Sequence, residues 1–265
     1  MTEHVREAPC FGGGVVVRAA GTGTSGLAAP AALVVAVAIL RRVHDRLSCF
    51  DDGSELSRLN RDDRPEVPAG ALLRRGAAAV GPAGWRSGGL GDATGGSPAG
   101  LGEWRAVGVD DPSRSVRRPA GVRLDSGGLA KGLAADLVAE RLTGHASWAV
   151  ECLGDVRVGG TEGRPRPVQV ADPFGGDAPV ATLPVVEGAI ATSGTTRRTG
   201  HLIDPRTGEP ADTGIVQATA LAPTGLEAEV RAKAALLAGP RDAARHLPHG
   251  GVIVLASGAV AEVSA

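Results

Sequence analysis

The longest apolar pattern in the chain lies in residues 28–48 and predicts an α-helix. Its larger apolar side chains recur at intervals of three to four residues, as expected for one helical face: Val35, Ile39, Leu40, Val43 and Leu47. The uninterrupted apolar run covers only residues 27–40, whereas a membrane-spanning helix needs about 20 residues. The charged sequence RRVHDRL follows directly. We therefore expect a largely buried helix and no transmembrane segment.

Two further helices are predicted later in the chain. Residues 129–142 place Leu133, Leu137, Val138 and Leu142 on one face, and residues 226–237 have a similar pattern. A short helical turn is expected after the Asp-Gly turn of residues 51–53, with Ser54 as its N-cap.

Short apolar or alternating runs predict strands in the remaining chain. These runs cover residues 12–18, 122–125, 148–150, 154–158, 168–170, 181–186, 189–191, 216–221 and 252–255. Residues 76–108 are glycine-rich and leave two interpretations open, a loop or a helix of weak pattern. Strands and helices are mixed without the regular alternation of a doubly wound sheet. We therefore expect an α+β fold of mixed or antiparallel sheets with packed helices, as one unit over residues 1–265.

Composition and charge exclude several classes of function. The formal net charge is −1, so no overall attraction to nucleic acid or to an anionic membrane is expected. Cys10, Cys49 and Cys152 contain no C-x-x-C pair, so a disulfide framework or a zinc site is not expected. Residues 1–7 are polar and show neither a signal-peptide core nor a lipobox, which favours a cytoplasmic location.

Lysine is rare in this chain, and its positions are informative. Of the 28 Lys and Arg residues only Lys131 and Lys233 are lysines. Lys131 lies in the segment DSGGLAKG, residues 125–132, between a predicted strand and a predicted helix. Backbone N–H groups in such a turn can hold phosphate, although neither a P-loop nor a G-x-G-x-x-G pattern is present. A compact ammonium is not replaced by a guanidinium, but a plain turn with a solvated lysine remains the alternative.

Two other segments carry candidate chemistry. Residues 191–208 combine hydroxyls, arginines, His201 and an Asp-Pro turn, which suits phosphate or ribose binding and a general base; a polar hairpin with a packing histidine is the alternative. In the predicted helix 226–237, Glu229 and Lys233 are four residues apart. An ordinary pair of this kind contributes about a few tenths of a kcal/mol.

Four segments, taken in order, resemble the ApbE family of FAD:protein FMN transferases. They are DDGSELSRLN (51–60), DSGGLAKGLAAD (125–136), ATSGTTRRTGHLIDPRTGEP (191–210) and ALAPTGLEAEVRAKAALLAGP (220–240). The likeness extends over residues 12–240 or so. It implies an enzyme that binds FAD, holds the diphosphate with Mg²⁺ and transfers FMN to a Ser or Thr hydroxyl of an acceptor protein, with release of AMP.

The resemblance also assigns expected roles to individual residues. It implies that His201 is the base for the acceptor hydroxyl, that the carbonyl of Gly128 and the carboxylate of Glu229 contact the metal, and that Asp136 is structural or near the site. The residues expected to bind FAD are Asp125, Lys131, Asn60, Phe50, Phe11, Thr192, Ser193, Thr195 and Ile203.

The helix 226–237 departs from the family pattern at the implied metal ligands. Where relatives have Asp, Asp and Thr, this chain has Glu229, Ala232 and Lys233. We therefore hypothesise that Lys233 replaces Mg²⁺ partly or wholly, with Glu229 as its ion-pair partner. The milder expectation is that Glu229, the Gly128 carbonyl and FAD oxygens hold Mg²⁺. Residues 85–96 match the family only loosely.

Alternative functions follow from the same departures. A flavin-binding protein could retain the FAD site without transfer, and a hydrolase could split FAD into FMN and AMP. A relative without activity is the remaining possibility.

Overall fold

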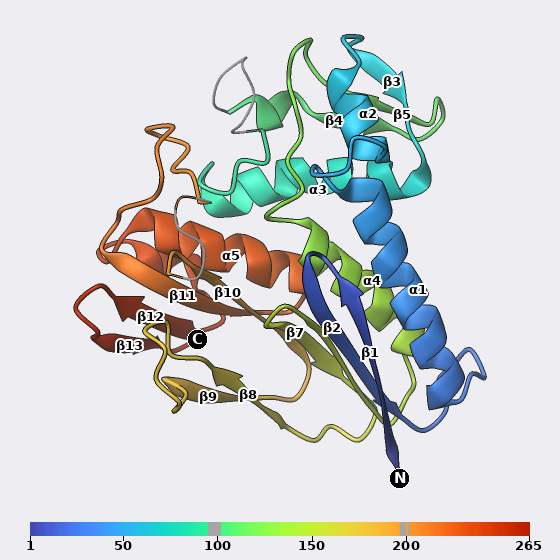
Figure 1. Ribbon diagram of the computed structural model, residues 1–265, viewed down its shortest axis with the longest axis vertical. Coiled ribbons are helices and arrows are strands. Elements are labelled where there is room, and N and C mark those ends of the chain that lie inside the picture. Colours follow the sequence, from blue (N-terminus) through green and yellow to red (C-terminus); the bar gives the residue numbers. More distant parts are fainter. Residues whose placement is uncertain (95–101, 197–199, 201) are drawn as a thin grey trace.

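The computed structural model describes residues 1–94, 102–196, 200 and 202–265 (Figure 1). Within these residues, eight strands form one antiparallel sheet in the order β1-β2-β6-β7-β10-β11-β12-β13. The strands are β1 (Glu3–Cys10), β2 (Gly13–Ala20), β6 (Ser147–Cys152), β7 (Asp155–Gly159), β10 (Gly188–Gly194), β11 (Ile215–Ala222), β12 (Gly251–Leu255) and β13 (Val260–Val263). The α+β prediction is confirmed, and the sheet is antiparallel throughout.

Two smaller sheets accompany the large one. One has the order β3-β5-β4, and the other is a ribbon of β8 and β9. Their bounds are β3 (Glu66–Pro68), β4 (Gly108–Asp110), β5 (Ser115–Arg117), β8 (Arg166–Val170) and β9 (Ala181–Val185). Figure 1 places the small β3-β5-β4 sheet at the end of the molecule distant from β8 and β9.

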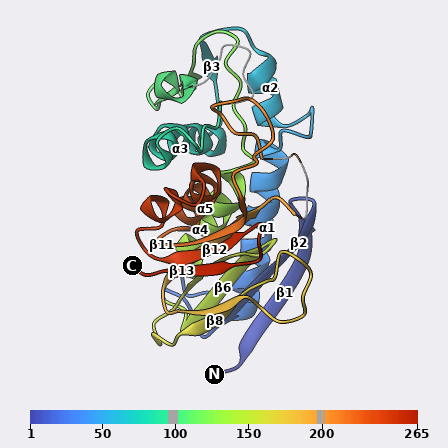
Figure 2. The same ribbon diagram turned by 90° about the vertical axis from the view of Figure 1, so that its left-hand side faces the viewer.

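Three helices cover one face of the large sheet, as Figures 1 and 2 show. They are α1 (Ala29–Leu47), α4 (Ala130–Leu142) and α5 (Gly225–Ala238). A fourth helix, α3 (Ala71–Ser87), packs on the outer side of α5, and α2 (Glu55–Arg61) follows α1 (Figure 2). Short 3-10 turns span Glu103–Ala106 and Ala243–His246. The part of the chain so described contains no helix that is both long and apolar enough to cross a membrane.

Helix α1 follows the predicted apolar pattern with one correction. Leu33, Leu40, Val43 and Leu47 are buried against the sheet and α4, and Pro30 occupies the first turn, where a missing N–H costs nothing. Val35 was expected on this face, but it is 39% exposed, because the buried stripe passes through Val37 instead.

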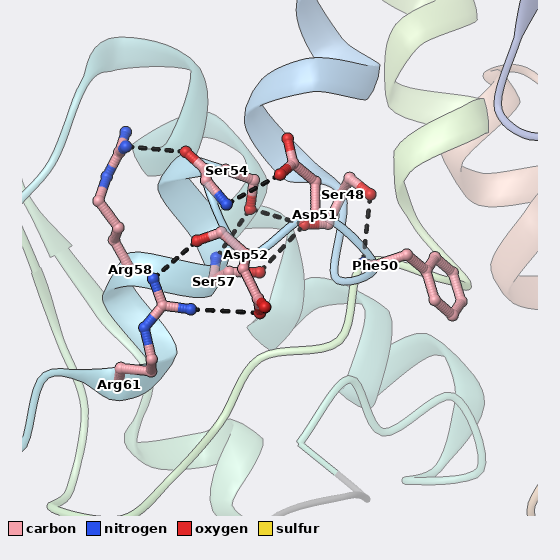
Figure 3. A network of polar contacts seen from close by, with 9 residues as sticks. Ser48, Phe50, Asp51, Asp52, Ser54, Ser57, Arg58 and Arg61 are labelled. Carbon is pink, nitrogen blue, oxygen red and sulfur yellow. Dashed lines mark hydrogen bonds and ion pairs between the residues drawn. The ribbon is translucent and has the colours of Figure 1, made fainter.

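Helix α2 begins at the cap that the sequence predicts. The Ser54 side chain accepts a hydrogen bond from the Ser57 N–H at 2.9 Å and donates one to the Ser48 carbonyl at 2.6 Å (Figure 3). Asp51 closes the preceding turn by accepting from the Gly53 N–H at 2.8 Å. The α1–α2 connection is therefore held by local polar contacts, and Phe50 extends away from them (Figure 3).

Of the two interpretations left open for residues 76–108, the helix holds for the first part. Helix α3 continues to Ser87 and ends at Gly88 in the left-handed region. Gly84 lies against the ring of the buried Trp104, where any side-chain Cβ would approach ring atoms within 2.3 Å. This contact anchors the end of α3 despite its weak apolar pattern.

Residues 122–125 were expected to form a strand, but they belong to none of the sheets. The reason is a side chain. The Asn60 amide donates to the Leu124 carbonyl and accepts from the Leu124 N–H, both at 2.8 Å. Asn60 thus satisfies both backbone groups of Leu124, and the Asp125 N–H donates to the Ala93 carbonyl at 2.7 Å, so these groups are not left for a neighbouring strand.

Candidate functional site

A cavity of about 440 Å³ opens where three distant parts of the chain meet. The turn before α4 contributes Gly127 and Gly128, the first turn of α4 contributes Lys131, and α5 contributes Glu229 and Lys233. The end of β10 contributes residues 191–194. Other lining residues are Phe11, Leu153, Gly154, Asp155, Gln169, Ala171, Thr196, Leu202 and Gln217. The volume lies within the range of about 300–1,000 Å³ that is typical of small-molecule sites.

The turn at residues 125–129 is fixed by its own hydrogen bonds and by its neighbours. The Asp125 carboxylate accepts from the Gly127 N–H at 2.8 Å, and the Ser126 carbonyl accepts from the Ala130 N–H at 2.8 Å as α4 begins. The Ser126 hydroxyl donates to the Leu47 carbonyl at 2.5 Å, which ties the turn to the end of α1. The glycine turn therefore has a defined shape before any ligand arrives.

Lys131 is held between two carboxylates. Its Nζ lies 2.5 Å from Asp155 Oδ2 and 2.5 Å from Glu229 Oε1. The Glu229 side chain is only 6% exposed, and that of Lys131 is 27% exposed. Burial opposes the charge on Lys131, but the two carboxylates outweigh it and raise the pKa of Lys131. Lys131 is therefore permanently charged at physiological pH.

The remaining oxygens of these carboxylates also have partners. Glu229 Oε2 accepts from the Gly132 N–H at 2.9 Å, and Asp155 Oδ1 accepts from the Thr192 N–H at 3.0 Å. Burial raises the pKa of Glu229, while Lys131 acts in the opposite direction. All four carboxylate oxygens in this cluster are therefore engaged, and the cluster joins α4, α5, β7 and β10.

The expected ion pair between Glu229 and Lys233 is wrong. Glu229 turns to Lys131 instead, and Lys233 has no ion-pair partner within the described ranges. The Lys233 side chain packs directly against Gly128: a Cβ placed on Gly128 would lie 3.1 Å from Lys233 Nζ and 3.3 Å from its Cδ. The pair is absent because Lys131 and the Gly132 N–H offer Glu229 closer partners on the neighbouring helix.

Asp136 holds α4 and α5 in a fixed relation. Its carboxylate accepts from the N–H groups of Gly225 at 2.7 Å and Leu226 at 2.9 Å, which are unpaired donors of the first turn of α5. Burial raises the pKa of Asp136, and the two N–H donors oppose that effect. Nearby, Gly132 approaches the backbone of Gly225 so closely that a Cβ on Gly132 would lie 2.5 Å from it.

Three residues expected to bind FAD precede the glycine turn in the sequence: Phe11, Phe50 and Asn60. Only Phe11 lies at the cavity. Phe11 lines the cavity and packs edge-on against His44, with ring centroids 5.4 Å apart. Asn60 is committed to the backbone of Leu124. Phe50 is 94% exposed and does not line the cavity.

The β10 segment is placed only in part. Thr192 and Ser193 line the cavity. Thr195 does not, and its backbone N–H donates a hydrogen bond to the Val216 carbonyl at 3.0 Å. Ile203 forms a bridge with Pro210 and is 41% exposed. His201, the expected base, lies outside the described residues.

Sequence reasoning gave no role to Asp155 or Gln217. Asp155 anchors Lys131, and Gln217 is buried at the cavity wall with its amide donating to the Ala171 carbonyl at 3.0 Å. The available signal for Asp155 was a carboxylate at the start of a predicted strand, directly after Gly154. Its partner lies 24 positions earlier and emerges only in the fold.

The side chains do not fit a divalent cation. Mg²⁺ takes oxygen ligands in strict octahedral geometry, and the carboxylate oxygens of Glu229 and Asp155 are already engaged. The remaining candidate is the Gly128 carbonyl, and Lys233 adds a positive charge close to the same residue. Across the described chain, no group of three His, Cys, Asp or Glu residues is arranged to hold a metal ion.

The fold and the cavity define an α+β protein in which a glycine turn leads into a helix with a lysine in its first turn. A family model for the ApbE family matches residues 96–255, more than half of the chain. The chain therefore belongs to the ApbE family. Known proteins similar to it extend this finding.

A curated relative, the FAD:protein FMN transferase of Treponema pallidum (strain Nichols), is 32% identical over 154 residues, which is 50% of this chain and 42% of that protein. This chain thus matches less than half the length of that relative. Among solved structures, an ApbE protein from Thermotoga maritima has a TM-score of 0.84 at 23% identity, over 98% of this chain and 97% of that one. The flavinyl transferase ApbE of Pseudomonas stutzeri has a TM-score of 0.82 at 22% identity, over 99% and 94% of the two chains. These two structures share the fold.

Proposed function

We propose that this protein is an FAD:protein FMN transferase. The observation that carries the proposal is the meeting of three sequence motifs, far apart in the chain, around one cavity. The glycine turn, the end of β10 and the middle of α5 each contribute residues to its wall. Membership in the ApbE family and the name of the Treponema pallidum relative support the same activity.

The proposed reaction is a phosphoryl transfer. A Ser or Thr hydroxyl of an acceptor protein attacks the phosphorus of the FMN half of FAD. A P–O bond forms to that hydroxyl oxygen, and the P–O bond to the bridging oxygen of the diphosphate breaks. AMP leaves with the bridging oxygen and its electron pair, and the hydroxyl proton passes to a base. Catalysis of this kind depends on positioning and on charge neutralisation.

The described residues would support that reaction mainly by binding. The backbone of Gly128 and the ammonium groups of Lys131 and Lys233, all of which line the cavity, would face the diphosphate. Asp125 shapes the turn through the Gly127 N–H. Ser193, at the end of β10, would offer a hydroxyl to the nucleotide, as would Thr192, whose hydroxyl is also hydrogen-bonded to that of Thr219 at 2.9 Å. His201 stays the proposed base on the strength of its motif.

Mg²⁺ enters the proposal only as an expectation from the family resemblance. If bound, it would neutralise charge on the diphosphate oxygens. Glu229 and the Gly128 carbonyl would be its nearest candidate ligands, but Glu229 is committed to Lys131 and Gly132. We therefore derive no step through the metal.

The test is transfer of flavin to a purified protein substrate of a related flavin transferase. We expect stoichiometric AMP release and flavin fluorescence that stays with the acceptor after denaturation and gel separation. A mutated acceptor, with Ala in place of the modified hydroxyl residue, is the control. Bound FAD without AMP would instead indicate a binding protein, and AMP with free FMN a hydrolase.

The His201→Ala variant tests the proposed base separately. It should bind FAD with unchanged affinity and lose transfer. If FAD binding is lost together with transfer, the role of His201 is in binding or structure and not in proton removal.

A further inference from the structure

The cavity contains two ammonium groups with different surroundings. Lys131 is paired with both Asp155 and Glu229 at 2.5 Å. Lys233 lines the same cavity but has no carboxylate partner among the residues that the structure describes. The side chains of Lys131, Lys233, Asp155 and Glu229 carry a formal net charge of zero. Both carboxylates are paired with Lys131. The positive charge that remains available to a ligand is therefore that of Lys233.

The position of Lys233 is set by the helix junction and not by the lysine itself. Asp136 fixes the first turn of α5 to α4, and Gly132 lets the two helices approach closely. Lys233 follows one turn after Glu229 on α5, and its side chain lies alongside Gly128 with Nζ close to it. An anion bound at Gly128 would therefore meet this ammonium.

The same arrangement disfavours a divalent cation at this point. A metal at Glu229 would have to share a carboxylate oxygen with the Lys131 ammonium or with the Gly132 N–H. It would also lie close to the charge of Lys233, and like charges repel strongly in a partly buried site. Both the ligand set and the local charge thus favour a side-chain cation.

We propose that Lys233 neutralises the diphosphate of the bound dinucleotide at the Gly128 turn, so that the protein binds FAD without a divalent cation. This inference rests on the proposed function, because the diphosphate belongs to FAD. Lys233 is a binding residue in this role, and Glu229 serves as a positioning residue that holds Lys131.

The experiment is an FAD titration, followed by flavin fluorescence or calorimetry, in excess EDTA and in millimolar Mg²⁺. For the unmodified protein we expect the two dissociation constants to agree. The variant Lys233→Gln removes the charge at similar size and should weaken FAD binding in EDTA by about tenfold to a hundredfold, the loss of one charge-assisted hydrogen bond. Lys233→Arg should retain part of the affinity. Arg241→Gln, at an exposed position after α5, removes the same charge outside the cavity and should leave binding unchanged.

A second measurement addresses the metal alone. In a Mn²⁺ titration followed by electron paramagnetic resonance, the protein without FAD should bind no stoichiometric Mn²⁺. Circular dichroism and thermal unfolding of each variant establish that it is folded.

The outcomes separate this inference from the proposed function. FAD binding that requires Mg²⁺, or transfer that requires Mg²⁺ and increases in Lys233→Thr, would overturn the role of Lys233 and leave the transferase assignment standing. Metal-independent binding that Lys233→Gln does not weaken would also overturn it. If FAD binds under neither condition, the proposed function fails and this inference fails with it.

Discussion

The ammonium of Lys131 lies 2.5 Å from Glu229 Oε1, although the two residues are 98 positions apart in the chain. The contact joins the first turn of α4 to the middle of α5, and Asp155 extends it to β7. It explains why a lysine is found at this position in a chain whose basic residues, Lys233 aside, are arginines. A compact ammonium fits between two carboxylates at the start of a helix, where a planar guanidinium needs more room.

Replacing Lys131 by methionine should destabilise the fold by about 3–5 kcal/mol at pH 8, because two buried carboxylates lose their counter-ion. Without Lys131 the folded-state pKa of Glu229 rises further above its ordinary value of 4.5. The folded variant then binds a proton that the unfolded chain has released, so its stability falls as the pH rises through that window. Urea unfolding at pH 5.5 and pH 8 should therefore show the larger deficit at pH 8.

The double variant K131M/E229Q is the matched control for this prediction. It removes one of the two stranded charges and should recover part of the stability at pH 8. Equal deficits at the two pH values would show that the carboxylates are not the source of the loss.

Replacing Asp136 by alanine should cost about 2–4 kcal/mol, because the first N–H groups of α5 lose a charged acceptor. The expected consequence at the cavity is weaker FAD binding, since α5 carries Glu229 and Lys233. Chemical denaturation and an FAD titration measure the two effects. Asp45→Asn, on the exposed face of α1, should change stability by no more than about 0.5 kcal/mol. An Asp136→Ala protein as stable as the parent would contradict the capping role.

Replacing Gly132 by alanine should destabilise the protein by about 1–3 kcal/mol, because the new Cβ would lie 2.5 Å from the Gly225 backbone and force α4 and α5 apart. Gly76→Ala in α3 is the matched control. There the added Cβ would meet Leu47 at 3.4 Å, an ordinary contact, and the substitution should stabilise by about 0.4–1 kcal/mol. Thermal unfolding of both variants tests the contrast, and a shared sign of the two shifts would refute the close helix contact.

Cys49 should be the thiol that iodoacetamide modifies in the folded protein, because Cys10 and Cys152 are buried. Partial burial and the neighbouring Asp125 carboxylate raise the pKa of Cys49, so its thiolate fraction at pH 7.5 is below that of a free cysteine. Asp125→Asn should lower that pKa and accelerate the reaction, as mass spectrometry would show. If the rate does not change, Asp125 and Cys49 do not interact in solution.

The elements with a strong local pattern could be predicted from the sequence. The periodic apolar residues predict helix α1, and Ser54 at the N-cap predicts α2. Strand β1 was missed because it is an edge strand whose mostly exposed side chains, among them Glu3 and Arg6, leave no apolar alternation to detect. Residues 122–125 were predicted to form a strand and do not, since Asn60 satisfies the backbone of Leu124 that a strand partner would pair.

The site could be predicted in its motifs but not in its pairings. The glycine turn, Thr192, Glu229 and Lys233 were all expected near one another, and they line one cavity. Which carboxylate holds which lysine depends on how α4 crosses α5, and that crossing is set by Gly132 and Gly225. No local pattern contains this information, so the expected Glu229–Lys233 pair proved wrong.

The two hydrogen bonds that the Asp136 carboxylate accepts from the start of α5 have a consequence for local opening of the molecule. Backbone amides at Gly225 and Leu226 should exchange with solvent only when α4 and α5 separate, because their acceptor sits on the other helix. The wall bearing both lysines then opens as one cooperative unit and not residue by residue. A ligand bound there should slow exchange along both helices together, including at positions far from the ligand.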